Sequence, residues 1–258
     1  MKVVIFAGGL GTRISEESIL RPKPMVEIGG KPILWHILKI YNTHGFNDFI
    51  ICLGYKGYMI KEYFMNYFLH NSDVTIDVKN NKTEIHTSSA ESFKVTLVDT
   101  GLSTKTAGRL KRVKKYVGDN QFMLTYGDGL SDININELIK FHNAQGKVAT
   151  VTTVVPEGKF GSILTDDTNI VKSFMEKPID SGSWINAGFF VLEPTVFDYL
   201  DGDMDEVMWE DKPLNDLTND RELVAYRFSG FWKCMDAVRD KNELNEMWER
   251  REAKWKKW

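Results

Sequence analysis

Residues 6–24 read FAGGLGTRISEESILRPKP and contain the most informative pattern in the chain. The apolar run KVVIFA at residues 2–7 leads into them and is typical of a buried β-strand. Two adjacent glycines, a third glycine, an arginine and a lysine between two prolines then follow. Glycines after a first strand let backbone N–H groups approach a phosphate, and basic side chains neutralise its charge. The segment therefore predicts a phosphate-binding loop at the end of a first β-strand.

Three kinds of phosphate loop compete for this segment. The pattern G-x-x-x-x-G-K-[ST] is absent, and the dinucleotide pattern G-x-G-x-x-G fails at its third glycine, where Ile14 stands. The expected second strand also ends in Leu53-Gly54-Tyr55 and has no acidic residue to bind a ribose. The third pattern, G-G-x-G-T-R followed by K-P, matches in full between residues 8 and 24.

Outside this loop, apolar runs alternate with helical periodicity up to residue 146. Strands are predicted within DFIICLG, KVTLVDTG and QFMLTYGDG, and helices within PILWHILKIYNTHG, YMIKEYFMNYF, RLKRVKKYVG and INELIKFHNAQG. This order predicts a Rossmann-like, doubly wound α/β fold with a mixed, mostly parallel sheet. The strand-rich second half predicts a small antiparallel subsheet, with turns at Asp166-Asp167 and at residues 180–182.

Nothing in the sequence separates two domains, because no Pro/Gly/Ser-rich linker interrupts it. We therefore expect one domain over residues 1–258. Residues 1–146 would form a nucleotide-binding half, residues 147–236 a sugar-phosphate-binding half, and residues 237–258 a helical tail.

Composition narrows the functional class. The 258 residues are 42% hydrophobic and 27% charged with a formal net charge of -3, which argues against nucleic-acid or membrane binding. The cysteines Cys52 and Cys234 have neither metal-site nor disulfide-framework spacing. The first apolar run is too short for a signal peptide. We expect a cytoplasmic protein that acts on small molecules.

The glycine-rich segment resembles the motif of the sugar-1-phosphate nucleotidyltransferases. Similar stretches follow in the family's order: VDTGLSTKTAGRLKR, FMLTYGDGL, FMEKP, INAGFFVLEP and GFWKCMDAVRDK. KPMVEIGGKPILWHI resembles the branch that uses CTP and glucose 1-phosphate. The resemblance covers nearly the whole chain and implies transfer of a cytidylyl group to the sugar phosphate, with release of pyrophosphate.

The resemblance implies that Arg13 and Lys23 hold the triphosphate and neutralise the charge that develops on pyrophosphate. The implied nucleotide-binding residues are Phe6, Ala7, Gly8, Gly9, Leu10, Gly11, Thr12, Arg13, Lys23, Thr104 and Arg109. Isolated basic residues are more often part of a solvated loop. Pro22 and Pro24 fix the backbone on both sides of Lys23, which favours a functional role.

Asp128 and Asp236 resemble the family's two magnesium ligands, and both count among the implied catalytic residues with Arg13 and Lys23. Magnesium prefers oxygen ligands, commonly one or two carboxylates with water and substrate phosphate. Asp128 follows a predicted strand, where α/β sheets bind ligands. Asp236 also precedes a helical pattern, so it is equally well interpreted as a helix N-cap. Relatives often have proline where this chain has Cys234.

The resemblance implies sugar-phosphate contacts at Gly127, Glu176, Lys177 and Asn186. Taken alone, Glu176 and Lys177 would be a surface turn pair. A phosphate monoester has its second pKa near ~6, so the attacking oxygen is already ionised at neutral pH. We therefore expect direct in-line attack on the α-phosphorus without a protein base, and we assign no role to any of the five histidines.

The C-terminal helical pattern buries Leu244, Met247 and Trp248 on one stripe and leaves Trp255 and Trp258 beyond it. These two tryptophans indicate either a loosely docked tail or a subunit contact, and tryptophan enrichment at interfaces favours the contact. The resemblance implies a homo-oligomer, with a hexamer favoured.

Three other functions compete with this interpretation. The same reaction with dTTP or UTP keeps the mechanism and changes the base. A sugar-nucleotide sensor without catalytic activity would not need the five residues Arg13, Lys23, Asp128, Lys177 and Asp236 together. A dehydrogenase is disfavoured by the missing third glycine.

Overall fold

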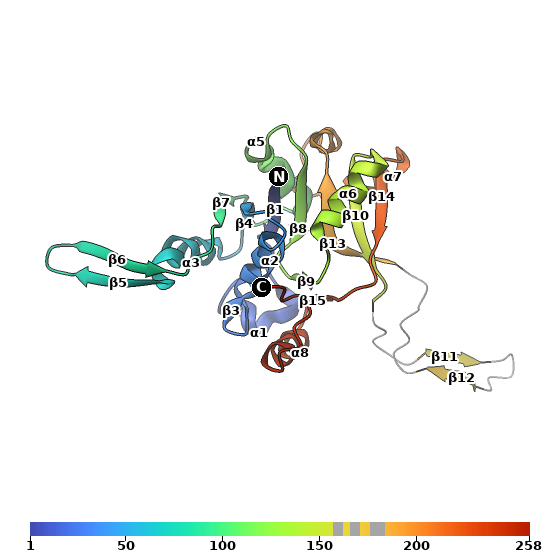
Figure 1. Ribbon diagram of the computed structural model, residues 1–258. Helices are drawn as coiled ribbons and strands as arrows, with labels where there is room; N and C mark the ends of the chain where they lie inside the picture. The colour runs from blue at the N-terminus through green and yellow to red at the C-terminus, as the bar shows by residue number, and fades with distance from the viewer. Residues whose placement is uncertain (157–161, 166–170, 176–183) are drawn as a thin grey trace.

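The computed structural model describes residues 1–156, 162–165, 171–175 and 184–258. A seven-stranded sheet forms the centre of the protein (Figure 1). The strand order is β14-β10-β13-β8-β1-β4-β7. The strands are β1 (Lys2–Ala7), β4 (Asp48–Leu53), β7 (Lys94–Asp99), β8 (Phe122–Tyr126), β10 (Ala149–Val154), β13 (Ile185–Leu192) and β14 (Leu223–Arg227). β13 is antiparallel to β8 and β10, and the other neighbouring pairs are parallel. The predicted mixed, mostly parallel sheet is confirmed.

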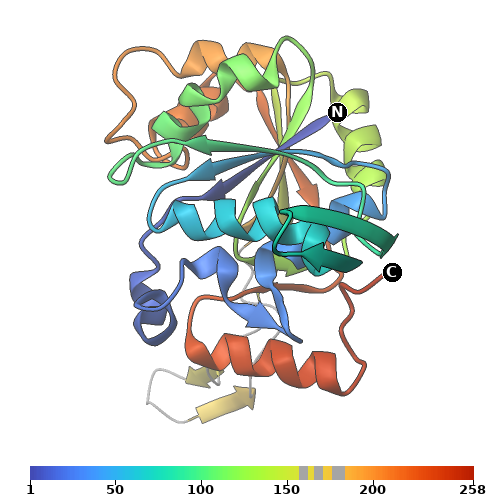
Figure 2. The ribbon, with the colours of Figure 1, turned by 90° about the vertical axis from the view of Figure 1, so that its left-hand side faces the viewer.

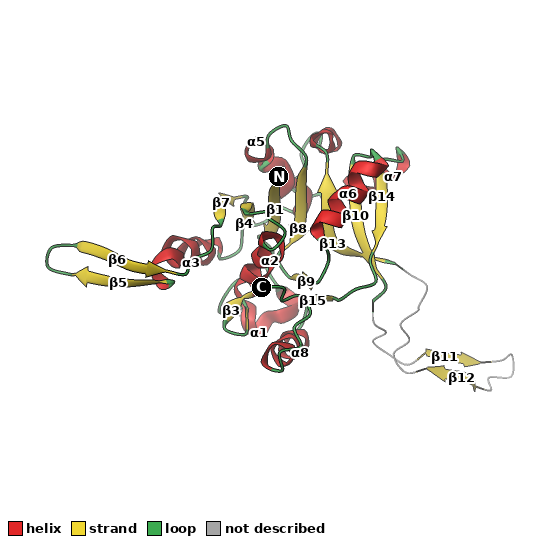
Figure 3. Cartoon of the chain, viewed as in Figure 1, coloured by secondary structure: helices red, strands yellow, loops and turns green. Residues whose placement is uncertain are grey.

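Helices cover both faces of this sheet (Figures 2 and 3). In β1, Val3 and Ile5 join one core cluster and Val4 and Phe6 the other, as expected for a strand buried on both faces. Residues of α2 (Ile33–Asn42), α3 (Gly57–His70), α6 (Ile135–Gln145) and α8 (Val238–Glu249) belong to the first cluster. Residues of α4 (Thr106–Arg112), α5 (Lys114–Val117), η3 (Pro194–Tyr199) and α7 (Lys212–Asn219) belong to the second. None of the helices in the described ranges is both long and apolar enough to cross a membrane.

Within the described residues, four small antiparallel strand pairs accompany the main sheet. They are β2 (Glu27–Ile28) with β3 (Lys31–Pro32), β5 (Ser72–Asp77) with β6 (Lys82–Ser88), β9 (Gly129–Ser131) with β15 (Trp232–Cys234), and β11 (Ser162–Thr165) with β12 (Val171–Met175). The last pair is the predicted antiparallel subsheet, and its predicted turns lie outside the described residues. The β5–β6 hairpin, which projects from the body in Figure 1, was not predicted.

The C-terminal tail differs from the prediction. Helix α8 ends at Glu249, and Arg251 takes a left-handed conformation (φ 61°) that turns the chain back toward the body. Trp255 is 0% exposed, and its indole N–H donates to Nδ1 of His36. The predicted subunit contact through Trp255 is therefore wrong, because this side chain completes the core of its own subunit.

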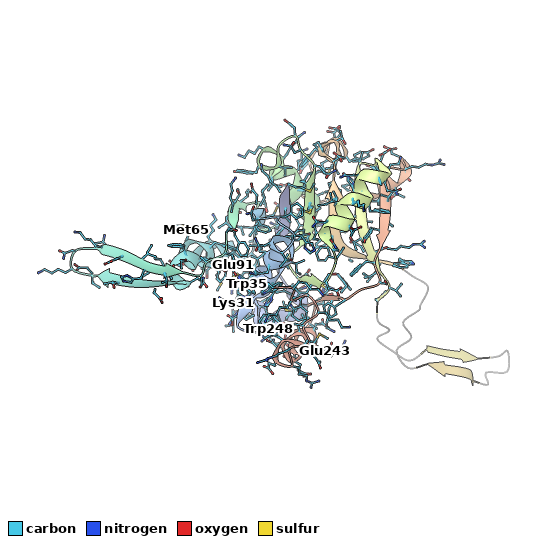
Figure 4. All side chains as sticks on the ribbon, in the orientation of Figure 1. Lys31, Trp35, Met65, Glu91, Glu243 and Trp248 are labelled. Carbon is cyan, nitrogen blue, oxygen red and sulfur yellow. The ribbon has the colours of Figure 1, made fainter. Side chains whose placement is uncertain are left out.

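Trp258 also packs within the subunit. Its ring meets that of Trp35 edge to face at 5.6 Å between centroids, and Lys256 lies over the ring of Trp248. Trp35 and Trp248, labelled in Figure 4, mark the helices α2 and α8 that the tail contacts. A continuous helix through residue 258, as predicted, would have carried these rings away from α2.

Candidate active site

The glycine-rich loop leaves β1 at the carboxyl end of the parallel strands, where α/β sheets bind ligands. Gly11 has φ 65°, a left-handed conformation that suits glycine, and it leads into the short turn η1 (Thr12–Ile14). A Cβ atom on Gly8 would lie 2.2 Å from Nη1 of Arg109, so any larger residue there would displace the Arg109 guanidinium. The sequence thus brings bare backbone to the rim of the sheet, and the Arg13 side chain on η1 is largely exposed.

A cavity of about 400 Å³ opens beside this loop. Its lining includes residues that the sequence predicted as nucleotide contacts, namely Phe6, Ala7, Gly8, Gly9, Leu10, Gly11, Lys23, Thr104 and Arg109. Asp128 and Gly127 also line it, and Gly127 is close enough to Phe6 that a Cβ would approach the Phe6 carbonyl oxygen to 2.9 Å. Thr12 and Arg13 are not among the lining residues.

Arg109 forms the floor of the cavity. It is 4% exposed, and its guanidinium donates to the carbonyl oxygens of Gly8, Leu53 and Gly101 at 2.9–3.0 Å. It also donates to the Thr100 hydroxyl at 2.7 Å. Burial lowers the pKa of this guanidinium. Arg109 therefore holds together the backbone at Gly8, Leu53 and Gly101 beside the cavity, a structural role that sequence reasoning missed, and its predicted nucleotide contact stays a prediction.

Lys23, which also lines the cavity, lies between two carboxylates. Its Nζ atom is 2.7 Å from Oδ2 of Asp128 and 2.8 Å from Oδ1 of Asp236. Nη1 of Arg13 lies 2.8 Å from the other oxygen of Asp236. Although burial opposes the charged form, Asp128 and Asp236 together raise the pKa of Lys23. The four residues predicted as catalytic, far apart in sequence, thus form one contact cluster.

The short pair β9–β15 brings the two carboxylates together. Gly129 pairs with Cys234, and the Met235 N–H donates to the Asp128 carbonyl oxygen at 2.9 Å. Asp128 and Asp236 therefore occupy adjacent positions on two antiparallel segments.

Asp236 does not cap the final helix. Helix α8 begins after Ala237, and Oδ2 of Asp240 accepts from the backbone N–H groups of Asp236 and Ala237 at 2.9 and 2.8 Å. The N-cap interpretation of Asp236 is therefore wrong, because Ala237 occupies the cap position and the Asp236 carboxylate accepts from Lys23 and Arg13. The Asp236 carboxylate faces Lys23 and Arg13, and against the opposing effect of burial Lys23 lowers its pKa.

The residues present fit a hard divalent cation. Ligand atoms of Asp128, Cys234 and Asp236 lie within 4.8 Å of one another. Burial, followed by the charge of Asp128, raises the pKa of the Cys234 thiol, so this sulfur is a neutral and poor ligand for magnesium. The two neighbouring carboxylates of Asp128 and Asp236 match the oxygen ligands that Mg²⁺ takes in proteins.

The sugar-side predictions are only partly described. Asn186 lies exposed near the start of β13, where its side-chain oxygen accepts from the Gly188 N–H at 2.7 Å. Glu176 and Lys177 lie outside the described residues. Sequence reasoning missed the cavity-lining residues Pro24, Lys105, Thr106, Tyr126 and Met208. All of these except Met208 stood inside motifs that the sequence had flagged, so position within a motif was the available signal.

The family model for nucleotidyl transferases matches residues 2–238. The chain is 56% identical to the glucose-1-phosphate cytidylyltransferase of Salmonella typhi and 46% identical to the probable glucose-1-phosphate cytidylyltransferase of Bacillus subtilis (strain 168). Both alignments cover 100% of this chain and 100% of the relative.

Solved structures share the fold. A putative glucose-1-phosphate thymidylyltransferase from Bacillus anthracis superposes with a TM-score of 0.69 at 18% identity, over 96% of this chain and 94% of that one. A UDP-glucose pyrophosphorylase complexed with UDP-glucose gives a TM-score of 0.68 at 18% identity, over 97% and 98%. The resemblance expected from the glycine-rich motif is confirmed by the family model and by the full-length relatives: this chain belongs to the nucleotidyl transferase family.

Proposed function

We propose that the protein transfers a cytidylyl group from CTP to α-D-glucose 1-phosphate and releases CDP-glucose and pyrophosphate. The observation that carries this proposal is 56% identity over the full length of a relative named for that reaction. The cluster of Lys23, Arg13, Asp128 and Asp236 at a cavity beside a glycine-rich loop is consistent with phosphate chemistry.

Mg²⁺ is the proposed cofactor, held by the carboxylates of Asp128 and Asp236. When bound, such an ion neutralises charge on phosphate oxygens and orients them for in-line displacement. Lys23 now neutralises the same two carboxylates. A cation there would release the Lys23 ammonium to a phosphate, where it serves as a point charge.

The protein's own contribution is to position the substrates and to stabilise charge. The sugar phosphate is a dianion near neutral pH, because its second pKa is about 6, so its oxygen attacks the α-phosphorus without a base. Lys23 and Arg13 stabilise the negative charge that builds up on the departing pyrophosphate. Glu176, Lys177 and Asn186 are proposed to hold the sugar phosphate, and Gly127 leaves room for it.

Cytosine is proposed to be selected by backbone groups at residues 6–8 and 101–104. Gly8 and the segment 102–104 line the cavity on two sides, and Arg109 fixes the carbonyl oxygens of Gly8 and Gly101. Cytosine presents an N4 donor beside an N3 acceptor, whereas uracil and thymine present the reverse. A site built on such hydrogen bonds discriminates by about 10⁴-fold.

Product analysis tests the reaction. The purified protein, incubated with CTP, glucose 1-phosphate and MgCl₂, should form CDP-glucose and pyrophosphate in equal amounts. Chelation of magnesium should stop both. Binding of CTP without formation of either product would support a non-catalytic sensor and contradict the proposal.

A homo-oligomer, with a hexamer favoured, and a cytoplasmic location complete the proposal. Exposed apolar side chains on α3 and on the β5–β6 hairpin support association; they are Tyr58, Met65, Phe68, Leu69, Ile76 and Ile85, with Val78 in the turn. Met65, labelled in Figure 4, is 79% exposed. The free thiols Cys52 and Cys234 suit a reducing compartment. A light-scattering mass equal to one 29.6 kDa chain would contradict the oligomer.

A further inference from the structure

One wall of the nucleotide cavity carries a polar cluster that the reaction described above does not use. Tyr126 ends β8 and Thr106 begins α4, and both line the cavity beside Met208. The hydroxyl groups of Tyr126 and Thr106 both reach the half-buried carboxylate of Glu210, each on a different oxygen, with a distance of 2.9 Å for Thr106.

This cluster fixes where the two hydroxyl protons point. An ionised carboxylate only accepts hydrogen bonds, so both hydroxyl groups donate to Glu210. The backbone N–H of Trp209 donates to Oγ1 of Thr106 at 2.7 Å, and this bond also directs the Thr106 hydroxyl proton toward Glu210. Burial, and then the charge of Glu210, raises the pKa of Tyr126 and keeps its phenol protonated. Each hydroxyl group therefore has no proton left to donate, and its oxygen can only accept; the Asn186 side chain is a further hydrogen-bond partner of the Tyr126 hydroxyl and lowers its pKa against these effects.

The position of this wall matches the middle of a bound nucleotide. Lys23 and Asp128 mark the end of the cavity that holds the phosphate chemistry, and Leu102 and Ser103 lie after β7, two strands beyond β1. Leu102 is 62% exposed, as suits an apolar surface for a base. A nucleotide that spans these ends places its ribose beside Tyr126 and Thr106. Ribose hydroxyl groups can donate, and the negative Glu210 behind the wall disfavours a phosphate there.

We propose that the Tyr126 and Thr106 oxygens accept hydrogen bonds from the 2′- and 3′-hydroxyl groups of the ribose, with Glu210 as the positioning residue that fixes both acceptors. The assignment deepens the proposed function and rests on it. The wall would thus select a ribonucleotide over a deoxyribonucleotide. One neutral hydrogen bond contributes about 0.5–1.5 kcal/mol, so kcat/KM should favour CTP over dCTP by roughly two- to ten-fold.

Three nucleotides and two conservative variants test the assignment. We would measure kcat/KM for CTP, 2′-deoxy-CTP and 3′-deoxy-CTP in the wild-type protein, Tyr126→Phe and Thr106→Val, at saturating glucose 1-phosphate. Each variant should lose discrimination against one of the two deoxy analogues and keep it against the other. Glu210→Gln, whose amide offers a donor to one hydroxyl group and an acceptor to the other, should reduce one of the two ratios and keep the other. Met208→Leu is the matched control, since it alters the same wall without a hydroxyl and should keep both ratios.

Several results would overturn the proposal. Equal losses with all three nucleotides in Tyr126→Phe and Thr106→Val would mean that the cluster only supports the fold. A changed KM for glucose 1-phosphate with unchanged nucleotide ratios would assign the cluster to the sugar. If UTP proves the better substrate, the same series run with uridine nucleotides separates a wrong base assignment from a wrong ribose assignment.

Discussion

Replacing Lys23 with methionine should separate its two roles. The Lys23 side chain is 12% exposed and joins Asp128 and Asp236 through hydrogen bonds of 2.7 and 2.8 Å. Without it, two carboxylates face each other and lack their shared cation. Charge-assisted hydrogen bonds contribute about 1.5–3 kcal/mol each, and partial exposure of the carboxylates reduces this, so the loss in unfolding free energy should be about 2–4 kcal/mol.

Magnesium should reverse part of this loss, because the ion and the Lys23 ammonium compete for the same carboxylates. Lys23→Met should therefore bind Mg²⁺ at least as tightly as the wild-type protein. Mg²⁺ at ten times its Kd should restore about 1.4 kcal/mol. Turnover should nevertheless fall by roughly ten- to a hundred-fold, since the phosphate loses a point charge.

Urea unfolding with and without MgCl₂, together with initial rates of pyrophosphate release, measures all three effects. Lys212→Met is the matched control, because Lys212 forms only an exposed (i, i+4) pair with Asp216 in the described residues and contributes at most about 0.5 kcal/mol. Weaker Mg²⁺ binding in Lys23→Met than in the wild-type protein would refute the shared-carboxylate reasoning.

Three further predictions concern the site and the core. Asp236→Asn should nearly abolish turnover with the fold intact, whereas Asp240→Ala, which removes the helix cap, should lower the unfolding free energy by about 1 kcal/mol in urea. Arg109→Lys should raise the KM for CTP and lower the melting temperature, because one ammonium cannot replace the contacts to three loop carbonyl groups; an unchanged KM would contradict its role as the cavity floor. Burial lowers the pKa of His36 from 6.5 to about 4. Between these two pH values the unfolded chain binds more protons than the folded protein, so the unfolding free energy decreases as the pH is lowered. The loss at pH 5 should be about 2 kcal/mol, and His36→Gln should abolish it in urea unfolding at pH 7 and pH 5.

Local patterns made the glycine-rich loop after β1 and the parallel strands predictable from the sequence. The segment KVVIFA followed by GGLGTR predicts a strand and a loop without further context, because a strand buried on both faces appears in the sequence as a continuous apolar run. The pairing of Asp128 with Asp236 came from the resemblance to a family. No local pattern encodes it, since it depends on two three-residue strands, β9 and β15, that meet only in the folded chain.

Other features escaped prediction because they depend on tertiary context. The C-terminal tryptophans lay outside the helical stripe. The chain returns them to α2 by a left-handed turn at Arg251, and because this position is not a glycine, the sequence did not indicate a turn there. Arg109 was expected to contact the nucleotide, and no sequence pattern indicates that its guanidinium donates to backbone carbonyl oxygens and to the Thr100 hydroxyl. Glu210 became a candidate only when its contacts to Tyr126 and Thr106 were known.

Initial rates with competing nucleoside triphosphates test the central claim most directly. Glucose 1-phosphate and MgCl₂ would be held constant, and pyrophosphate release would be measured with CTP, UTP and dTTP in turn. We predict a strong preference for CTP, approaching the roughly 10⁴-fold limit of a hydrogen-bonded base site. A dTTP or UTP rate equal to or above the CTP rate would contradict the assignment as a cytidylyltransferase.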